Sequence, residues 1–445
     1  MAKFWRAVLG VPLAFVLVLT GGLTLDAGAS TTFTTLFSSS ALGWSEGMAV
    51  NGGNLYAASY ANQAVIERAA DGTISTVATT PGNPKGLAFD AQGNLYMSVQ
   101  GGCNCVYVES AAQLASGVMA SPGSGLVEVL NTGCYGAGGL AFNTSGDLAV
   151  SMCPGGVSEI LGVSAATLRG GSFPLGPGAN GYQVIARSTD SSSTDVTFDS
   201  TGNLLFTNAS SLDGVSAAQV ANALAGGGAA VPVSLVAGSV GLSRPVGVKV
   251  EPNGNVIVAD DNTGLVSELS GPSVQLALFG GAQVSSSNVT PLTTITPMGM
   301  QLASLAVDSR GLIYVGDGGN NYVRVSASYP IAPKSLVAST TSSSLSVHWS
   351  ASNATSWRCT LLYGFGAPSS FTQIVRAPSC TFSGLAADTS YGVSIVATGI
   401  AGNSSPSEIF TVTSPNRSIS CARGRLVRHI TGVSPRCPLG FHRVA

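Results

Sequence analysis

Hydrophobic and polar residues alternate in short segments along most of the first three quarters of the chain. The stretch 52–77, GGNLYAASYANQAVIERAADGTISTV, contains three such segments separated by turns rich in Gly, Asn and Asp. Alternation over four to eight residues is typical of a β-strand with one buried face, and these turn residues favour tight reversals. The pattern therefore predicts consecutive antiparallel strands.

The same pattern occurs six times. Aligned on the turn glycine, the copies are centred on Gly53, Gly93, Gly146, Gly202, Gly254 and Gly311, which gives spacings of 40, 53, 56, 52 and 57 residues. A period of this size with about four strands per copy is typical of a β-propeller blade. The six copies predict a six-bladed propeller.

Two further features refine this prediction. The last copy has only three evident strands, and the segment 31–37, TTFTTLF, precedes the first copy, so we expect it to complete the last blade and protect its edge. Three copies also contain Ser-Ala-Ala, beginning at Ser110, Ser164 and Ser216. Serine is a good N-cap, so these motifs predict short rim helices that serve packing or, alternatively, contact a partner.

The last copy also carries a resemblance. The segment 314–326, YVGDGGNNYVRVS, resembles the NHL-repeat signature, and the other copies match its first half. The resemblance implies an NHL-like propeller of the gluconolactonase-like superfamily over residues 30–329. It is specific for fold and carries little information on activity.

The sequence pattern changes after the predicted propeller. Residues 330–415 resemble a fibronectin type III domain, in which Trp349, Leu385 and Tyr391 match the buried tryptophan, the leucine and the corner tyrosine. Residues 416–445 form a basic module between two cysteines. The expected fold is therefore all-β: a six-bladed β-propeller, a fibronectin type III β-sandwich and a short disulfide-bracketed tail.

The first 29 residues have the three parts of a secretory signal peptide. Lys3 and Arg6 are positive, 7–25 is apolar, and 27–29 is a small-residue cleavage site. We therefore expect a secreted, extracellular protein, with cell-wall association left open and no transmembrane segment after cleavage; the alternative is an uncleaved anchor. Only 9% of residues are charged and no basic stripe with aromatics occurs, so nucleic acid is not an expected partner.

Eight cysteines in an exported chain favour disulfides. We expect the bonds Cys359–Cys380 in the second module and Cys421–Cys437 in the tail. The four propeller cysteines are expected on one face in two bonds of open pairing, with a tetrahedral zinc site as the alternative. These four residues are Cys103, Cys105, Cys134 and Cys153.

The tail is strongly basic and contains no acidic residue. It is similar to a short Cys-bracketed basic ending found on many secreted bacterial proteins. Its arginines are either a solvated surface or a means of binding an anionic wall polymer or membrane. The surface-binding candidates are Arg423, Arg425, Arg428, Arg436 and Arg443.

Candidate catalytic residues are few. Calcium-dependent enzymes of the gluconolactonase-like family place Glu, Asn, Asn and Asp at the inner-strand starts of successive blades. The corresponding residues here are Glu46, Lys85, Gly138, Thr194, Val246 and Ala303. Only Glu46 matches, and Asp195 is a second candidate if the register slips by one residue.

The ends of the second strands give a further set of weak candidates. Asp260, Asp261 and Asp317 come from the last two blades and either form a weak cation or sugar site or each cap their own turn. No cofactor is expected, although a weak calcium site is left open.

All three histidines lie outside the propeller, which removes the usual acid–base group at neutral pH. The favoured function is therefore a non-catalytic binding or scaffold protein, expected to be monomeric, whose partner is an extracellular protein, a glycan or a cell-wall polymer. The alternatives are a secreted hydrolase or accessory protein of polysaccharide degradation and a degenerate lactonase that uses Glu46.

Overall fold

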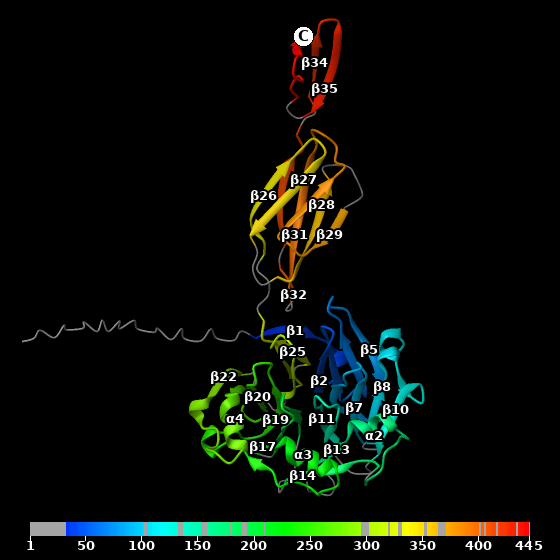
Figure 1. Ribbon diagram of the computed structural model, residues 1–445, viewed down its shortest axis with the longest axis vertical. Helices are drawn as coiled ribbons and strands as arrows, with labels where there is room; N and C mark the ends of the chain where they lie inside the picture. Colours follow the sequence, from blue (N-terminus) through cyan, green and yellow to red (C-terminus); the bar gives the residue numbers. More distant parts are fainter. Residues whose placement is uncertain are drawn as a thin grey trace, which may run out of the picture.

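The computed structural model describes most of the chain after residue 32 (Figure 1). The described ranges are 33–101, 105–131, 137–152, 158–178, 180–188, 194–208, 210–294, 302–318, 321–327, 332–350, 354–363, 371–399, 402–404, 406–414, 417–432 and 435–444. Over these residues the protein is an all-β chain that consists of a six-bladed β-propeller, a β-sandwich and a small three-stranded sheet.

Five blades are formed by consecutive strands. Blade 1 contains β2 (Ser45–Asn51), β3 (Asn54–Ser59), β4 (Ala64–Arg68) and β5 (Ile74–Thr79). Blade 2 contains β6 (Asn83–Phe89), β7 (Leu95–Gln100), β8 (Cys105–Glu109) and β10 (Gly125–Asn131), with the short β9 (Ser121–Pro122) at its edge. Blade 3 contains β11 (Ala137–Phe142), β12 (Leu148–Met152), β13 (Ser158–Val163) and β14 (Gln183–Ser188).

Blade 4 contains β15 (Val196–Phe198), β16 (Leu204–Asn208), β17 (Ser211–Val215) and β18 (Val233–Ser234). Blade 5 contains β19 (Pro245–Val250), β20 (Val256–Asp260), β21 (Leu265–Leu269) and β22 (Val289–Thr294). The second strand of each blade is buried along nearly its whole length, because neighbouring blades cover both of its faces.

The last blade joins the two ends of the propeller. It contains β23 (Leu302–Val307), β24 (Ile313–Asp317), β25 (Tyr322–Val325) and, as its outer strand, β1 (Thr34–Ser38). β1 pairs antiparallel with β25, from Thr34 opposite Val325 to Ser38 opposite Tyr322. The prediction that the segment 31–37 closes the ring is confirmed for residues 34–37, and the strand extends to Ser38, whereas 31 and 32 lie outside the described residues.

Short helices follow the third strand in several blades: α1 (Ala111–Ser116), α2 (Ala165–Gly170), α3 (Ala217–Leu224) and α4 (Gly271–Leu278). The Ser110, Ser164 and Ser216 hydroxyls each accept a backbone N–H of the first helical turn, as the Ser-Ala-Ala motif predicts. The sequence analysis missed α4, which has Pro272 in its first turn.

In blades 2 to 5, the turn residue after the aligned glycine connects the turn to the next helix. In α1, the N–H of Ala111 donates to Asn94 Oδ1 at 2.9 Å, and in α3 the N–H of Ala217 donates to Asn203 Oδ1 at 2.8 Å. Equivalent bonds reach Asp147 in blade 3 and Asn255 in blade 5. The repeated Gly-Asn or Gly-Asp pair therefore both forms the turn and caps the helix beside it.

The inner strands approach one another too closely for side chains at several positions. A Cβ on Gly86 would lie 2.5 Å from the Gly138 carbonyl oxygen, and one on Gly47 would overlap the Lys85 carbonyl. Hydroxyls connect the same strands, since Ser98 Oγ accepts the Gly86 N–H and donates to the Gly138 oxygen at 2.5 Å. Blades 1 to 3 are thus held backbone to backbone around the axis.

The second unit is a sandwich of two sheets. One contains β26 (Lys334–Thr340), β27 (Ser344–Ser350) and β30 (Ser379–Ser383). The other contains β28 (Ser356–Tyr363), β29 (Phe371–Val375), β31 (Ser390–Gly399), β32 (Gly402–Asn403) and β33 (Ser407–Val412). Trp349 and Trp357 pack edge to face in the core, and Tyr391 Oη accepts the Ala386 N–H, as expected for a corner tyrosine.

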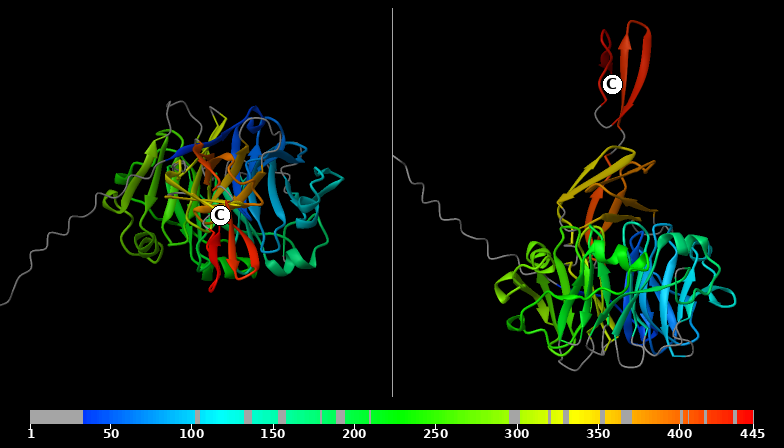
Figure 2. Two further views of the ribbon diagram at one scale, coloured as in Figure 1. Left: turned by 90° about the horizontal axis from the view of Figure 1, so that it is seen from above. Right: turned by 60° about the horizontal axis from the view of Figure 1, so that its bottom comes forward.

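The third unit is the sheet formed by β34 (Arg417–Arg423), β35 (Leu426–Gly432) and β36 (His442–Val444). It lies at the opposite end of the molecule from the propeller (Figure 1). The right view of Figure 2 shows the β-sandwich on the side of the propeller that carries the helices. This agrees with the course of β25, which starts opposite Asp317 and ends opposite Tyr314, so the chain leaves the propeller on the side of the aligned turns.

Candidate functional site

The starts of the inner strands contain a recurring irregularity. In blades 1, 2, 3, 5 and 6 the pairing of the first two strands shifts register at this point. Glu46 lies within the shift of blade 1 and Lys85 within that of blade 2. A β-bulge re-aims side chains and is common beside functional sites. Five of the six predicted positions around the propeller axis therefore lie at bulges, and the position in blade 4 does not.

Four charged side chains gather at this end of the axis. Lys85 Nζ lies 3.8 Å from Glu46 Oε2, and Arg244 Nη2 of blade 5 lies 3.2 Å from Asp261 Oδ2. Burial raises the pKa of Glu46; Lys85 opposes this, while Asp261 raises that pKa further and Arg244 lowers it. The charges of blades 1, 2 and 5 therefore act on one another across the opening.

An aromatic pair borders these charges. The rings of Trp44 and Tyr60 lie 5.9 Å apart, and Lys85 Nζ lies 5.7 Å from the centre of the Tyr60 ring. Tyr60 Oη donates to Gln100 Oε1 at 3.4 Å, and the backbone N–H of Trp44 donates to Asn321 Oδ1 at 3.0 Å. We call the set Trp44, Glu46, Tyr60, Lys85, Arg244 and Asp261 the propeller mouth.

Side-chain amides surround the aromatic pair. Gln63 Nε2 donates to Asn83 Oδ1 at 3.4 Å, and Asn62 donates to the backbone oxygens of Ser40 and Ala41. Gln63 and Asn62 are exposed. The mouth thus combines flat aromatic surfaces, both signs of charge and neutral donors and acceptors.

The structure separates the aspartates that the sequence suggested for a cation. Asp195 Oδ2 accepts the Val248 N–H at 3.0 Å and the Lys249 ammonium at 2.5 Å, which links blades 4 and 5. Asp260 accepts backbone N–H groups of Ser243, Arg244 and Thr263. Both carboxylates therefore hold the propeller together.

Asp317 lies 3.5 Å from Arg324 Nη2 and is almost fully buried. Among the residues that the structure describes, no three His, Cys, Asp or Glu side chains are grouped closely enough to hold a metal ion. The four carboxylates Glu46, Asp195, Asp260 and Asp317 thus have separate local roles rather than a shared centre.

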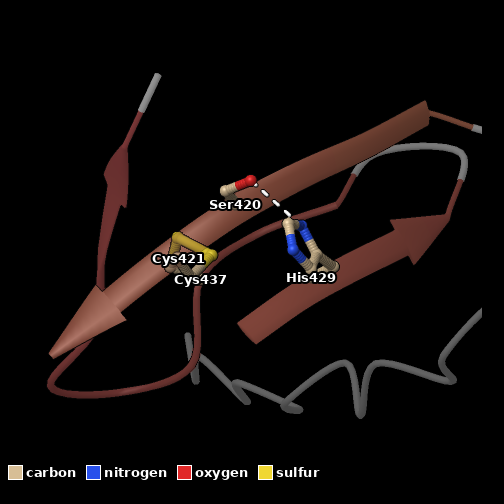
Figure 3. Close-up of a disulfide and its surroundings, with 4 residues drawn as sticks. All are labelled: Ser420, Cys421, His429 and Cys437. Carbon is tan, nitrogen blue, oxygen red and sulfur yellow. Dashed lines mark hydrogen bonds between the residues drawn. A yellow bond between two sulfur atoms is a disulfide. The ribbon is translucent and has the colours of Figure 1, made fainter. Parts of the chain in front are cut away.

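The cysteines only partly follow the expected pairing. Cys421 and Cys437 form the predicted disulfide (Figure 3). Cys359 and Cys380 do not: both are buried free thiols. They belong to opposite sheets, with Cys359 on β28 and Cys380 on β30. A hydrogen bond with Cys380, and then burial, raise the pKa of Cys359.

The propeller cysteines are described only in part. Cys105 takes part in a disulfide. Cys103, Cys134 and Cys153 lie outside the described residues, so their pairing stays a prediction.

The sequence pattern did not point to several residues of the mouth. Lys85 interrupts the apolar inner strand of blade 2, and Trp44 stands directly before the first inner strand. These two sequence features could have identified Lys85 and Trp44 as residues of the mouth. It also missed Glu109 at the end of β8, whose side chain is fully buried with both oxygens without a hydrogen-bond partner among the described residues. Burial, and then the charge of Glu67, raise the pKa of Glu109 to about 7.

A separate pocket of about 300 Å³ lies on the β-sandwich, between the edge strands β29 and β30. Phe371, Gln373, Thr381, Phe382 and Leu385 are among its lining residues. It contains no charged residue and shares none with the mouth. No helix in the described part of the chain has the length and apolar character needed to cross a membrane.

Comparison with known proteins gives similarity in fold alone. No protein-family model matches the chain, and no curated protein is similar to it in sequence. A streptogramin B lyase structure is 12% identical and covers 66% of this chain and 96% of its own, with a TM-score of 0.44. The WD40 β-propeller domain of Doa1 is also 12% identical and covers 66% of this chain and 96% of its own, with a TM-score of 0.41.

An extracellular domain of a one-component system from Bacteroides thetaiotaomicron is 13% identical, and it matches 87% of this chain and 59% of its own with a TM-score of 0.44. Solved structures similar to the chain thus include β-propellers and extracellular domains.

Proposed function

We propose that the protein is an exported, non-catalytic binding protein whose propeller mouth recognises a glycan. The observation that carries the proposal is the meeting of the Trp44–Tyr60 pair with the charges of Glu46, Lys85, Arg244 and Asp261 at one opening. Aromatic rings offer rigid apolar faces against which the C–H faces of sugar rings pack. Carboxylates, ammonium groups and amides bind the sugar hydroxyls and fix their orientation.

The state of the carboxylates supports binding rather than catalysis. Asp261 is paired with Arg244 and Glu46 with Lys85, so each acid already has a cationic partner. Groups arranged in this way offer a ligand both donors and acceptors.

Export supports an extracellular ligand. In this proposal residues 1–29 are removed as a signal peptide, residues 30–329 form the binding propeller, and the fibronectin type III domain at 330–415 is a spacer to the basic module at 416–445. The Cys421–Cys437 disulfide is consistent with an oxidising compartment. The protein acts as a monomer in this arrangement.

A second candidate is a hydrolase that acts on the same glycan. The raised pKa of Glu46 favours it, because a carboxyl that keeps its proton closer to neutral pH is suited to general acid catalysis. A glycosidase also needs a second carboxyl group. Asp261 is the only other acid of the mouth, and its ion pair with Arg244 is less suited to that role.

The test is a glycan array with the mature chain, followed by calorimetry on the hits. Trp44→Ala and Lys85→Ala should each weaken binding at least tenfold. Phe279→Ala is the matched control, because it removes an aromatic side chain that is 68% exposed directly after α4, on the other side of the propeller. Equal binding by Trp44→Ala and the control would contradict the proposed site.

The same glycans are assayed for hydrolysis. We expect no turnover. Turnover that is lost in Glu46→Gln while binding is kept would establish the hydrolase instead.

A further inference from the structure

The pairing register of the C-terminal sheet sorts its side chains onto two different faces. Residues directly opposite each other in an antiparallel pair lie on the same face, and faces alternate along a strand. Cys421 pairs with Arg428 on β35 and with Arg443 on β36, while Arg423 pairs with Leu426. All of these residues therefore lie on one face.

Arg417 belongs to the same face, since it is four residues before Cys421 on β34. We call this side, which carries Arg417, Arg423, Arg428 and Arg443, the arginine face. All four arginines are exposed. The alternation of the strands thus gathers the positive charge, which the sequence alone did not show.

The opposite face of the sheet carries no arginine on the described strands β34, β35 and β36. Ser420 is opposite His429, and their side chains form a 3.0 Å hydrogen bond (Figure 3). Ala422 is opposite Val427 and His442. One face therefore carries the arginines, and the other carries Ser, Ala, Val and His side chains.

Covalent and aromatic contacts hold the arginine face rigid. The disulfide to Cys437 brings the segment after β35 across this face, and Arg428 lies 5.2 Å from the ring of Phe441 in that segment. Ile419 and Cys421, which lie on the same face, are buried. Residues 416–445 contain six arginines and no acidic residue, so no carboxylate side chain of this segment neutralises them.

Exposed apolar side chains accompany the charge. Leu426 on the arginine face is 52% exposed, and Leu439, two residues after Cys437, is fully exposed. A soluble polyanion is bound by charge and gives such leucines no contact. A bilayer surface accepts both, because arginines meet anionic headgroups while nearby apolar side chains enter the interface.

We propose that the arginine face docks the protein onto an anionic lipid bilayer. Arginines 417, 423, 428 and 443 contact lipid headgroups, and Leu426 and Leu439 insert at the edge of the contact. The propeller mouth does not take part, so this inference does not rest on the proposed glycan site.

The experiment is co-sedimentation of the full mature chain with vesicles. One set contains phosphatidylglycerol in phosphatidylcholine and the other contains phosphatidylcholine alone. We expect binding to the first set only, and a steep decrease as salt is raised. Failure to bind phosphatidylglycerol vesicles at low salt would overturn the proposal.

Two matched variants separate the face from net charge. Arg417→Gln, Arg423→Gln and Arg443→Gln together should weaken vesicle binding about 100-fold at low salt. The control replaces three exposed arginines elsewhere, Arg169→Gln, Arg358→Gln and Arg376→Gln, and should change binding less than threefold. Equal weakening by both triple variants would show that net charge alone acts and would overturn the docking face.

A third variant separates lipid from polymer. Leu426→Ser with Leu439→Ser should weaken binding to phosphatidylglycerol vesicles at least fivefold and leave binding to soluble polyphosphate unchanged. If vesicle binding is unaffected while polyphosphate competes at equal charge, the partner is a polyanion and the lipid assignment is wrong. Trp44→Ala should keep vesicle binding, which keeps this test distinct from that of the glycan site.

Discussion

Charged residues are used differently in the propeller and in the C-terminal sheet. Residues 30–330 contain 8 basic and 18 acidic residues, and six of those eight bases form ion pairs. Residues 416–445 contain six arginines and no acid. The propeller thus pairs most of its basic residues internally, whereas the C-terminal sheet exposes its arginines to solvent. Outside the propeller mouth, changes to charge should therefore affect stability in the first region and binding in the second.

The largest expected effect comes from removing the strand that closes the propeller. A chain that begins at residue 39 lacks β1 and loses its pairing with β25 and the burial of Leu36. We expect the propeller to lose about 4 kcal/mol or more, from burial of one leucine and several backbone hydrogen bonds. Urea unfolding measures this, with a chain that begins at residue 33 as the control. Equal midpoints for the two chains would show that closure does not stabilise the ring.

The second effect tests whether paired charge stabilises the propeller. Asp195→Ala leaves the Lys249 ammonium and the Val248 N–H without their acceptor, and should cost about 3 kcal/mol. Asp195→Asn keeps an oxygen acceptor and should cost less. Chemical denaturation of both variants measures the difference. If alanine and asparagine are equally tolerated, the link between blades 4 and 5 contributes little.

The third effect concerns the one propeller carboxyl that is buried without a described hydrogen-bond partner. The folded-state pKa of Glu109 is raised to about 7, so its protonation favours the folded state fully below the unfolded pKa of about 4.3 and this contribution is lost as pH rises through 7. Glu109→Gln should therefore stabilise the protein by about 1–3 kcal/mol at pH 8 and have little effect at pH 4.5. Melting curves across pH 4.5–8 test this, and an equal shift at both ends would contradict it.

The smallest effect completes the comparison. Arg417→Gln, Arg423→Gln and Arg443→Gln together should change the free energy of unfolding by less than about 0.5 kcal/mol, because exposed charges contribute little to stability. Calorimetry of the variant beside the mature chain measures it. A loss similar to that of Asp195→Ala would mean that these arginines are structural after all.

The sequence predicted most of the fold because the repeat fixes the register of its own turns. Each aligned glycine marks the same turn, and the Gly-Asn pair that made the repeat visible also caps the following helix through Asn94 and Asn203. The closing strand was predictable from a count of strands. The helix α4 was missed because its first turn contains Gly and Pro in place of Ser-Ala-Ala.

The candidate site was less predictable, because it depends on contacts between distant blades. Arg244 and Asp261 lie about 200 residues from Glu46 in sequence, and only the closed ring brings their charges into range of its carboxyl. The expected Cys359–Cys380 bond was wrong, because membership of one module does not fix how two side chains on opposite sheets are placed. Both residues are buried in the same core and stay free thiols.

The way the ring closes also fixes when β1 can pair during synthesis of the chain. Thr34 donates a hydrogen bond to the carbonyl of Ala327, which is 293 residues later in the chain. At roughly 5–20 residues per second, ribosomes need about 15–60 s to make that stretch, so the first strand waits for its partner. Thr34, Thr35 and Ser38 give this strand a polar composition, which suits a segment that remains solvated until the last blade exists. The final blade can therefore be completed only after every other blade has been synthesised.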